Sequence, residues 1–314
     1  MKVLKFGGTS VGSAKRIKEV AKLITGRGAN IIVLSAMSGT TNTLVEIADY
    51  LYKRNVNGAK ETINCLEKRY GEVMAELFAD ATALEAAKER IDAIFAHIRT
   101  FTHNDDFSEA DEKEILAQGE LMSTSLMHFY LHEQGFNSVW LPALDFMRTD
   151  HNGEADVDYI TLKITPMLEA NPDADLFVTQ GFICRNHKGG TDNLQRGGSD
   201  LTASLIGAAI NAEEIEIWTD IDGMHNNDPR FVDKTEPVAE LHFDEAAELA
   251  YFGAKILHPT CVMPAKLNNI PIRVLNTMEP EARGTLIYNT VHSRSIKAVA
   301  AKDGVIAVKI RSSR

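Results

Sequence analysis

Two short glycine-containing segments have the residue types of an anion-binding site. Lys5 stands two residues before Gly7-Gly8-Thr9-Ser10, and Arg196 directly precedes Gly197-Gly198-Ser199-Asp200. Each segment comes just before a helical pattern, where free backbone N–H groups and the helix dipole favour negative charge. A cation beside such donors suits an anionic group that is held while charge moves during phosphoryl transfer. The spacing therefore predicts two cradles for phosphate or carboxylate groups.

A third copy of the pattern, Gly189-Gly190-Thr191-Asp192, lies between polar, hairpin-like residues. Glycine pairs permit positive φ and tight turns, so we interpret this copy as a turn rather than a ligand site. None of the copies fits Gly-x-x-x-x-Gly-Lys-[Ser/Thr], and Gly-x-Gly-x-x-Gly does not follow the first predicted strand. The standard mononucleotide and dinucleotide motifs are therefore excluded.

Further candidate groups lie at predicted strand ends and loops. The segment 35–42 brings hydroxyl groups to a strand end, where open α/β sheets place their ligands. Glu120 lies in a helical pattern and, when buried, would suit an ammonium group. Trp218 to Gly223 ends a strand in two carboxylates, which would hold ribose or a Mg²⁺ shell, or cap a turn. Arg230 and Lys255 add cations near apparent loops, although each of these groups taken singly is by default a solvated surface residue.

His128 and His132 are spaced to share one face of a predicted helix. Glu133 lies outside the His-Glu-x-x-His order of a zinc peptidase, so we favour ordinary packing over metal binding. The three cysteines are far apart and form no Cys-x-x-Cys pair, which predicts reduced thiols rather than a zinc site or a disulfide framework.

Length and charge narrow the function class. The chain has 314 residues, enough for one large domain or two, and a net charge of −11 at pH 7. With 44 acidic against 33 basic residues, we expect no nucleic-acid partner bound through a broad basic face. Lys2 to Phe6 alternates without the apolar run of a signal peptide, and the apolar runs are strand-sized, so we expect no membrane partner. A cytoplasmic protein is the prediction.

The elements that position these groups follow an alternating pattern. Short apolar runs alternate with amphipathic helical patterns, which is typical of an α/β fold with a mainly parallel sheet. The segment 59–132 is predicted to be a helical insertion of three helices, broken near 80–82 and 102–106, and 243–267 is helical with a break at His258-Pro259. The predicted strands are Val3 to Phe6, Ile31 to Leu34, Ser138 to Leu141, Leu176 to Val178, Ile215 to Trp218, Ile272 to Leu275 and Leu286-Ile287.

Several of these motifs, taken together and in order, resemble the aspartate kinases of the amino acid kinase family. They are Lys5 to Val11, Gln118 to Ser123, Arg196 to Asp200, Trp218 to Asp220, Asp228 to Arg230 and Phe252 to Pro259. The resemblance covers about residues 1–290. It implies a three-layer αβα sandwich with a mainly parallel central sheet. It also implies transfer of the ATP γ-phosphoryl group, with Mg²⁺, to the β-carboxylate of L-aspartate, giving 4-phospho-L-aspartate on the way to lysine, threonine and methionine.

The resemblance also implies residue roles. Lys5 and Asp200 would be catalytic, with Lys5 bridging the transferring phosphate and the acceptor carboxylate. The aspartate site would contain Ser35, Thr41, Glu120, Arg196, Ser199 and Asp200, with Arg196 on a carboxylate and Glu120 answering the amino group. The ATP site would contain Lys5, Gly7, Gly8, Thr219, Asp220, His225, Arg230 and Lys255. Many family members carry tyrosine at the position of His225. No metal ligand is assigned to the protein, and Mg²⁺ would be held mainly by the ATP phosphates.

The same resemblance divides the chain. Residues 1–292 would be the catalytic domain, and 293–314, with β-rich runs at 296–300 and 305–310, would begin an ACT-type regulatory domain. A homo-oligomer is expected at full length, with lysine or threonine as effector. Two alternatives stay open: a kinase of the same fold acting on glutamate, acetylglutamate or carbamate, and a non-catalytic amino-acid sensor. Lys5, Asp200 and Lys255 favour an enzyme, because a sensor has no need of phosphate-directed cations.

Overall fold

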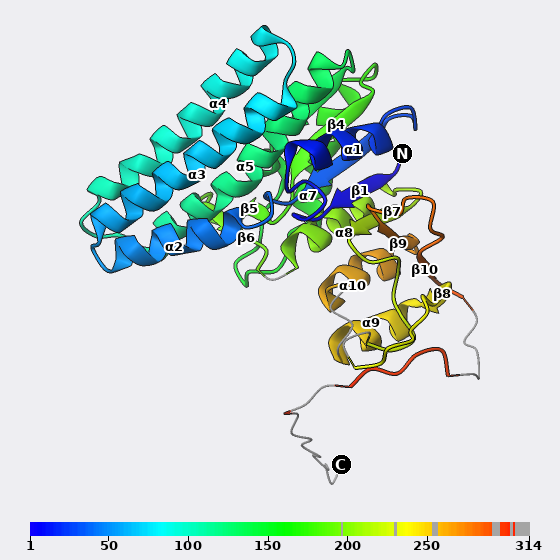
Figure 1. Cartoon of the computed structure of the whole chain (residues 1–314). Helices are drawn as coiled ribbons and strands as arrows, with labels where there is room; N and C mark the ends of the chain where they lie inside the picture. Colours follow the sequence, from blue (N-terminus) through cyan, green and yellow to red (C-terminus); the bar gives the residue numbers. More distant parts are fainter. Residues whose placement is uncertain (196, 229–230, 253–256, 291–295, 302–303, 305–314) are drawn as a thin grey trace.

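The computed structural model describes residues 1–195, 197–228, 231–252, 257–290, 296–301 and 304 (Figure 1). The strands of its main sheet are β1 (Val3–Phe6), β2 (Asn30–Leu34), β3 (Ser138–Leu141), β4 (Leu176–Gln180), β7 (Ile215–Thr219), β8 (Glu240–His242), β9 (Ile272–Asn276) and β10 (Thr285–Tyr288). Their order is β3-β4-β2-β1-β7-β9-β10-β8. Neighbouring strands are parallel except β9 and β10, which are antiparallel. The mainly parallel sheet is thus confirmed.

Helices cover both faces of this sheet. On one face lie α1 (Ala14–Ile24), α2 (Thr40–Tyr52), α3 (Val56–Leu77), α4 (Ala81–Thr100), the 3-10 turn η1 (Phe101–His103) and α5 (Glu109–Glu133). On the other lie α6 (Ala143–Phe146), α7 (Val157–Glu169), α8 (Gly198–Ile210), α9 (Phe243–Phe252) and α10 (Pro259–Leu267). Alternate residues of β1 divide between the two cores, with Leu4 and Phe6 in the first and Val3 in the second. The predicted three-layer αβα sandwich is confirmed.

Side-chain caps explain where the helices of the first layer begin. The hydroxyl of Ser13 accepts from the backbone N–H of Arg16 at the start of α1, and Asp80 caps α4. Ser108 and Asp111 form a capping box at the start of α5. The cap of α4 lies at the first predicted break, and the cap of α5 lies just after the second. They separate α3, α4 and α5, which form the long helical bundle in Figure 1.

Several segments differ from the prediction, among them the edge strand β8, which was not predicted. Helix α7 was not predicted, because Ile160 and Ile164 are its only buried residues and Pro166 lies inside it, so its apolar periodicity is weak. The run 296–300, predicted to be β-rich, has irregular backbone. There the N–H of Val299 donates to the carbonyl of Asn226 at 2.9 Å. The second β-rich run, 305–310, lies outside the described residues.

The loops that leave the carboxyl ends of four neighbouring parallel strands meet at one edge of the sheet. The N–H of Gly7 donates to the carbonyl of Trp218, that of Ser35 to Phe6, and that of Gly181 to Leu34, at 3.3, 3.1 and 2.9 Å. The backbone therefore continues the sheet pairing for one residue beyond β1, β2 and β4. This edge is where an open α/β sheet binds its ligands.

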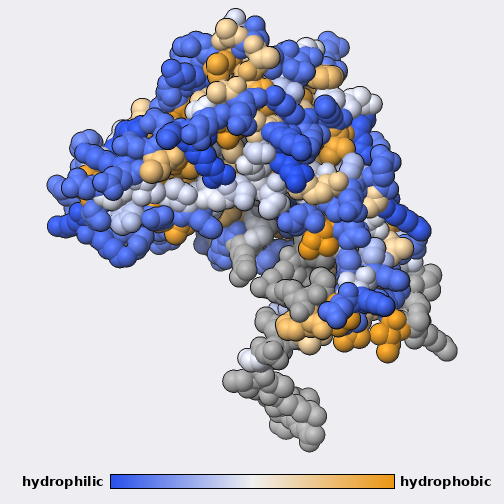
Figure 2. Space-filling view, in the orientation of Figure 1, coloured by the Kyte–Doolittle hydropathy of each residue, from blue (hydrophilic) through white to orange (hydrophobic). Residues whose placement is uncertain are grey.

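The surface of the described residues is mainly hydrophilic over α2, α3 and α4, as Figure 2 shows. Apolar side chains lie over α9 at the lower edge of the same view. Within the described ranges, the helices are too short or too polar for any of them to span a membrane.

Candidate active site

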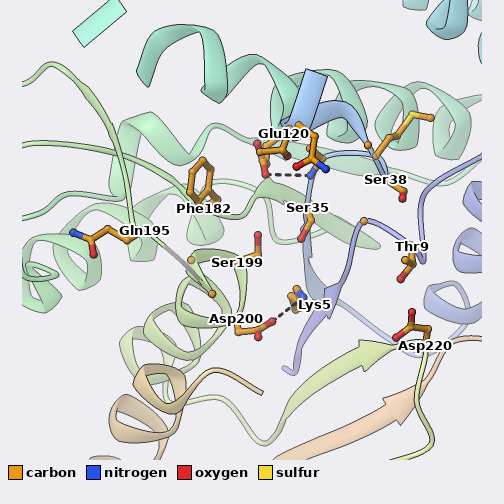
Figure 3. A pocket seen from close by; sticks show the side chains of 18 residues that line it. Lys5, Thr9, Ser35, Ser38, Glu120, Phe182, Gln195, Ser199, Asp200 and Asp220 are labelled. Carbon is orange, nitrogen blue, oxygen red and sulfur yellow. Dashed lines mark hydrogen bonds and ion pairs between the residues drawn. The ribbon is translucent and has the colours of Figure 1, made fainter. Parts of the chain in front are cut away.

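A cavity of about 590 Å³ opens at the carboxyl edge of the sheet (Figure 3). It is lined by the loops after β1, β2, β4 and β7, by α5, and by the first turn of α8. The residues that line it are Lys5, Gly8, Thr9, Ser35, Ala36, Met37, Ser38, Gly39, Thr41, Asn42, Glu120, Phe182, Gln195, Gly197, Gly198, Ser199, Asp200 and Asp220. Segments more than 200 residues apart in the sequence thus contribute to one site, as the motif analysis predicts.

Lys5 and Asp200 form the charged centre of the cavity. Lys5 extends from β1 and Asp200 from the first turn of α8, and the distance from Lys5 Nζ to Asp200 Oδ1 is 2.7 Å. Each side chain is 12% exposed, so the pair is largely shielded from water. The positive end of the α8 dipole also favours the Asp200 carboxylate. The ion pair therefore holds the ammonium group of Lys5 in place at the cavity wall.

The N-terminus of α8 supplies backbone donors. Gly197 is its N-cap residue, with φ of +76°, and makes no side-chain capping hydrogen bond. The first N–H groups of a helix have no partner within the helix, so an uncapped end leaves them to a ligand. Gly198 and Ser199 of the same turn line the cavity. This geometry matches the anion cradle predicted from the glycine pair and its serine.

Glu120 lies on α5 at the opposite wall and is 3% exposed. Its Oε1 accepts from the N–H of Ala36 at 3.1 Å, and within the described residues its Oε2 is buried without a hydrogen-bond partner. Burial raises the pKa of this carboxyl group to about 8. Gly119 allows the close approach of α5, because a Cβ there would stand 2.9 Å from that of Ala36. A buried carboxylate with a vacant oxygen suits a cationic group of a ligand.

The loop after β2 forms a third wall. The N–H of Ser38 donates to the carbonyl of Gly8 at 3.0 Å, and Thr41 lines the cavity. A Cβ on Gly8 would stand 2.7 Å from the carbonyl oxygen of Ala36, so only glycine permits this approach of two loops. From α3, Arg69 donates to the carbonyl of Ser38 at 2.7 Å. The helical insertion thus fixes a loop that lines the site.

Only some of the residues predicted to bind the nucleotide line the cavity. Asp220 lines the cavity, whereas Gly7 and Thr219 do not. Both lie beside lining residues: the hydroxyl of Thr219 donates to Asp220 Oδ1 at 3.2 Å, and a Cβ on Gly7 would stand 3.6 Å from Lys5 Nζ. Gly8, predicted for the same role, lies in the wall itself.

His225 does not line the cavity. Its Nε2 is 2.6 Å from Asp222 Oδ1 and its Nδ1 is 2.7 Å from the hydroxyl of Thr235, so both ring nitrogens are engaged within the loop. The imidazole thus joins two parts of its own loop, and the role of His225 in the ATP site stays a prediction. Three further predicted cations, Arg196, Arg230 and Lys255, lie outside the described residues.

Two lining residues were missed by the sequence prediction. Phe182 and Gln195 have positive φ values of 69° and 57° and flank a hairpin formed by β5 (Ile183–Arg185) and β6 (Thr191–Asn193). The hairpin turns near Gly189, which has φ of +86°, so the turn interpretation of the middle glycine pair is confirmed. The N–H of Leu194 donates to the carbonyl of Phe182, which closes the hairpin base at the cavity. The segment Gln180-Gly181-Phe182 after a strand was the available signal.

His128 and His132 have packing roles in the structure. The hydroxyl of Ser138 contacts His128 Nδ1 at 2.8 Å, and His132 Nε2 contacts the carbonyl of the same serine at 2.8 Å. Burial lowers the pKa of His128 to about 4. Within the described part of the chain, His, Cys, Asp and Glu residues form no group of three or more that could hold a metal ion.

Comparison with known proteins places this geometry in a family. The model of the amino acid kinase family matches residues 1–276. The chain belongs to the amino acid kinase family. Among similar family members are lysine-sensitive aspartokinase 3 of Escherichia coli, 36% identical over 91% of this chain and 64% of that protein, and aspartokinase 1, chloroplastic, of Arabidopsis thaliana, 33% identical over 99% and 56%.

Solved structures agree with the family assignment. E. coli aspartokinase III in complex with aspartate and ADP (R-state) superposes with a TM-score of 0.79 at 32% identity, over 93% of this chain and 65% of that one. The same enzyme with lysine and aspartate (T-state) gives a TM-score of 0.82 at 33% identity over the same shares. The chain spans less than two thirds of the length of the curated relatives named above.

Proposed function

We propose that this chain carries the catalytic domain of an aspartate kinase. The reaction joins a β-carboxylate oxygen of L-aspartate to the γ-phosphorus of ATP and breaks the bond from that phosphorus to the β,γ-bridging oxygen, releasing ADP. The observation that carries the proposal is one cavity with the Lys5–Asp200 pair on one wall and the half-satisfied Glu120 carboxylate on another. An amino acid with two carboxylates offers an ammonium group to Glu120 and an anion to Lys5. The likeness to a structure containing aspartate and ADP supports the same assignment.

Chemistry at this site needs no strong general base. The side-chain carboxyl of aspartate has a pKa near 3.9 and is already ionised at neutral pH. The barrier comes from bringing one anion to another in line, and cations and backbone N–H groups lower it. We propose that Lys5 bridges the transferring phosphoryl group and the acceptor carboxylate. Its ion pair with Asp200, which holds the ammonium group at the cavity wall, supports this role. The first turn of α8 adds backbone donors beside them.

Aspartate would be oriented by the charge of Glu120 at its ammonium end and by hydroxyl groups of the protein along its length. Glu120 Oε2 would take the ammonium group, and its burial makes that pairing strong because water is excluded. The hydroxyl groups of Ser35, Thr41 and Ser199 line the same cavity. Arg196, which precedes the glycine pair in the sequence, is proposed to bind a carboxylate of the substrate.

The nucleotide is proposed to lie along Gly7, Gly8 and Asp220, with Arg230 and Lys255 on its phosphates. Mg²⁺ would neutralise phosphate charge and enter bound to ATP. Among the described lining residues the acidic donors are the isolated carboxylates of Asp200, Asp220 and Glu120, which fits an ion held mainly by the phosphates rather than by a protein cage.

The proposal is tested by trapping the acyl phosphate. The chain is incubated with ATP, Mg²⁺ and one acid at a time, with hydroxylamine present to convert any acyl phosphate to a hydroxamate. We expect a signal with L-aspartate that exceeds the signals with L-glutamate and N-acetyl-L-glutamate. A larger signal with glutamate would assign the site to another kinase of the family. Absence of a signal with every acid, from protein shown to be folded, would favour a sensor.

We further propose that the domain boundary lies near residue 292 and that residues 293–314 begin a regulatory domain. The strand β10 belongs to the main sheet, which supports a catalytic domain that extends past residue 276. A longer protein would then assemble as a homo-oligomer in the cytoplasm and respond to lysine or threonine. Relatives named as lysine-sensitive, or solved with lysine, support that regulation.

A further inference from the structure

The first turn of α10 lies against the glycine pair that opens α8. Helices α8 and α10 pack together, and His258 is the N-cap residue of α10. A Cβ on Gly197 would stand 2.4 Å from both Cβ and Cγ of His258 and 2.9 Å from its Cδ2. Real Cβ atoms almost never approach closer than 3.0 Å. The imidazole of His258 therefore occupies the space beside the Gly197 backbone and contacts it directly.

The second glycine is packed from elsewhere. A Cβ on Gly198 would stand 2.9 Å from Cδ2 of Phe182 and 3.2 Å from Cβ of Leu194. The glycine pair is thus held between the hairpin residues and the imidazole of His258. Gly197 has φ of +76° and leads directly into the α8 turn that carries Asp200, so any shift of the pair moves the partner of Lys5.

His258 is itself fixed in place. Its Nδ1 is 2.7 Å from the hydroxyl of Thr260, and its carbonyl accepts from the N–H of Cys261 at 3.1 Å. Cys261 is buried close enough to the ion pair that the charge of Asp200 adds to burial in raising its thiol pKa well above the usual range. The buried thiol of Cys261 therefore stays neutral within electrostatic range of the ion pair. One turn of α10 reaches from Gly197 to the Lys5–Asp200 pair.

We propose that His258 is a positioning residue: by packing its imidazole on Gly197 it fixes the first turn of α8, and through it the place of Ser199 and Asp200 relative to Lys5. His258 does this as a ring of the right size held by Thr260, without touching the reacting atoms. The kinetic part of this inference rests on the proposed kinase function, whereas the structural part rests on the contact with Gly197 alone.

The test compares two variants with a matched control. In His258→Ala the ring is lost, and we expect kcat with aspartate and ATP to fall about 10-fold to 100-fold while either KM changes less than about threefold, because misplaced groups act on the transition state. In His258→Phe the ring is kept, and we expect kcat within about threefold of the parent. His103→Ala, at an exposed site in η1, controls for loss of a histidine and keeps parental kcat.

A second readout does not depend on activity. Hydrogen exchange of the segment 197–203 is expected to be much faster in His258→Ala than in the parent chain. In His258→Phe, which keeps the ring but loses the hydrogen bond to Thr260, we expect only the small increase that Thr260→Val also gives. Equal exchange in His258→Ala and the parent overturns the proposal, even in a chain that shows no kinase activity. Equal loss of kcat in His258→Ala and His258→Phe also overturns it, because an imidazole nitrogen would then be required.

A variant that removes only the hydroxyl partner covers the case in which His258→Ala does not fold. Thr260→Val keeps the shape of the side chain and removes the hydrogen bond to His258 Nδ1. We expect faster exchange of 197–203 and a kcat reduced by a few-fold at unchanged overall stability, which urea unfolding measures. Exchange and kcat both equal to those of the parent contradict a role for the held ring.

Discussion

At the scale of single residues, the site combines two buried carboxylates with opposite environments. Asp200 has a cation 2.7 Å away, whereas Glu120 has one oxygen bonded to a backbone N–H and the other without a partner in the described structure. A buried carboxylate that lacks a cation is held partly neutral by its raised pKa. Asp200 therefore holds Lys5 in place, whereas Glu120 is proposed to pair with a cationic group of the ligand.

Replacing Lys5 tests the first of these roles. Lys5→Ala removes the cation that would offset charge on the transferring phosphoryl group, and we expect kcat to fall at least about 100-fold. The fold is expected to survive, because Lys5 faces the cavity rather than either core. Hydroxamate formation measures the rate and circular dichroism checks the fold. A kcat near that of the parent would remove Lys5 from the mechanism.

On the proposed pairing of Glu120 with the substrate ammonium group, we expect the pKa of Glu120 to make aspartate binding depend on pH. With a pKa of about 8, the empty site holds a proton at pH 6, and an ammonium group displaces it. We expect the Kd for aspartate to fall as pH rises from 6 towards 8 and then to level off. Titration calorimetry at several pH values measures this slope. Glu120→Gln is expected to weaken binding by about 10-fold to 100-fold and to bind with a Kd that no longer falls with pH.

The raised pKa of Glu120 also predicts how the free energy of unfolding changes with pH. The pKa of Glu120 is raised from 4.5 in the unfolded chain to about 8 in the fold, so the folded state binds more protons between these values. The free energy of unfolding of the empty protein therefore falls as pH rises from about 5 to about 8. Urea unfolding of the parent and Glu120→Gln isolates the contribution. A difference between the two chains that stays constant with pH would contradict the burial of an ionisable Glu120.

At the scale of elements, glycines decide how closely loops and helices approach. Gly8 sets the β1 loop against the β2 loop, and Gly119 sets α5 against Ala36. The sequence has three glycine pairs. The structure places Gly8 and the pair Gly197-Gly198 in the cavity wall and confirms the pair at 189–190 as a turn. The turn of the hairpin was predicted, but the place of Phe182 at the cavity was not, because a backbone hydrogen bond from Leu194 closes the hairpin base and no side-chain pattern reports it.

Local patterns predicted the strands and the breaks of the insertion because burial repeats along each element. They missed the three-residue edge strand β8, which is too short to show alternation, and α7, where two buried residues give no clear period. They also placed strand in 296–300, where β-branched composition did not lead to pairing. His225 was assigned to the nucleotide from family position alone. Its contacts with Asp222 and Thr235 depend on how the loop folds, which the motif does not encode.

A glycine substitution tests the loop contact. Gly8→Ala would place a Cβ 2.7 Å from a backbone oxygen, and we expect the free energy of unfolding to fall by about 1–3 kcal/mol and kcat to fall at least about 10-fold. Gly26→Ala is the control: φ is +75° but space is open, so about 1 kcal/mol is lost without a change in kcat. Equal kcat in the two variants would contradict a functional contact between the loops.

At the scale of the whole molecule, the two ends of the sheet carry different groups of residues. The carboxyl end holds the cavity, whereas the amino end holds a charge network around Glu216, which is 1% exposed. Glu216 contacts Lys2 and Arg27 at 3.0 Å each and accepts from Trp218 Nε1 at 2.9 Å. Lys2 directly precedes β1, Arg27 lies in the loop before β2, and Trp218 lies in β7, so the network connects the central strands of the sheet.

Removing Glu216 from this network is expected to lower the stability of the fold without changing the kinetic constants. Glu216→Ala leaves two cations and a buried indole N–H without their shared acceptor, and we expect the free energy of unfolding to fall by about 3 kcal/mol. The kcat and both KM values of the folded protein are expected to match those of the parent, because the cavity lies at the other end of the sheet. Urea unfolding and steady-state kinetics measure the two effects. A changed KM for aspartate would show that the ends are coupled.

The central claim is that this cavity transfers phosphate from ATP to the β-carboxylate of aspartate. The most direct measurement supplies L-aspartate labelled with ¹³C at its β-carboxyl carbon, together with ATP and Mg²⁺, and follows ¹³C and ³¹P NMR. We predict that the labelled carbon becomes coupled to phosphorus in the presence of the parent chain, and that it does not in Lys5→Ala. Consumption of ATP by the folded parent chain with no phosphorus coupling at that carbon would contradict the account.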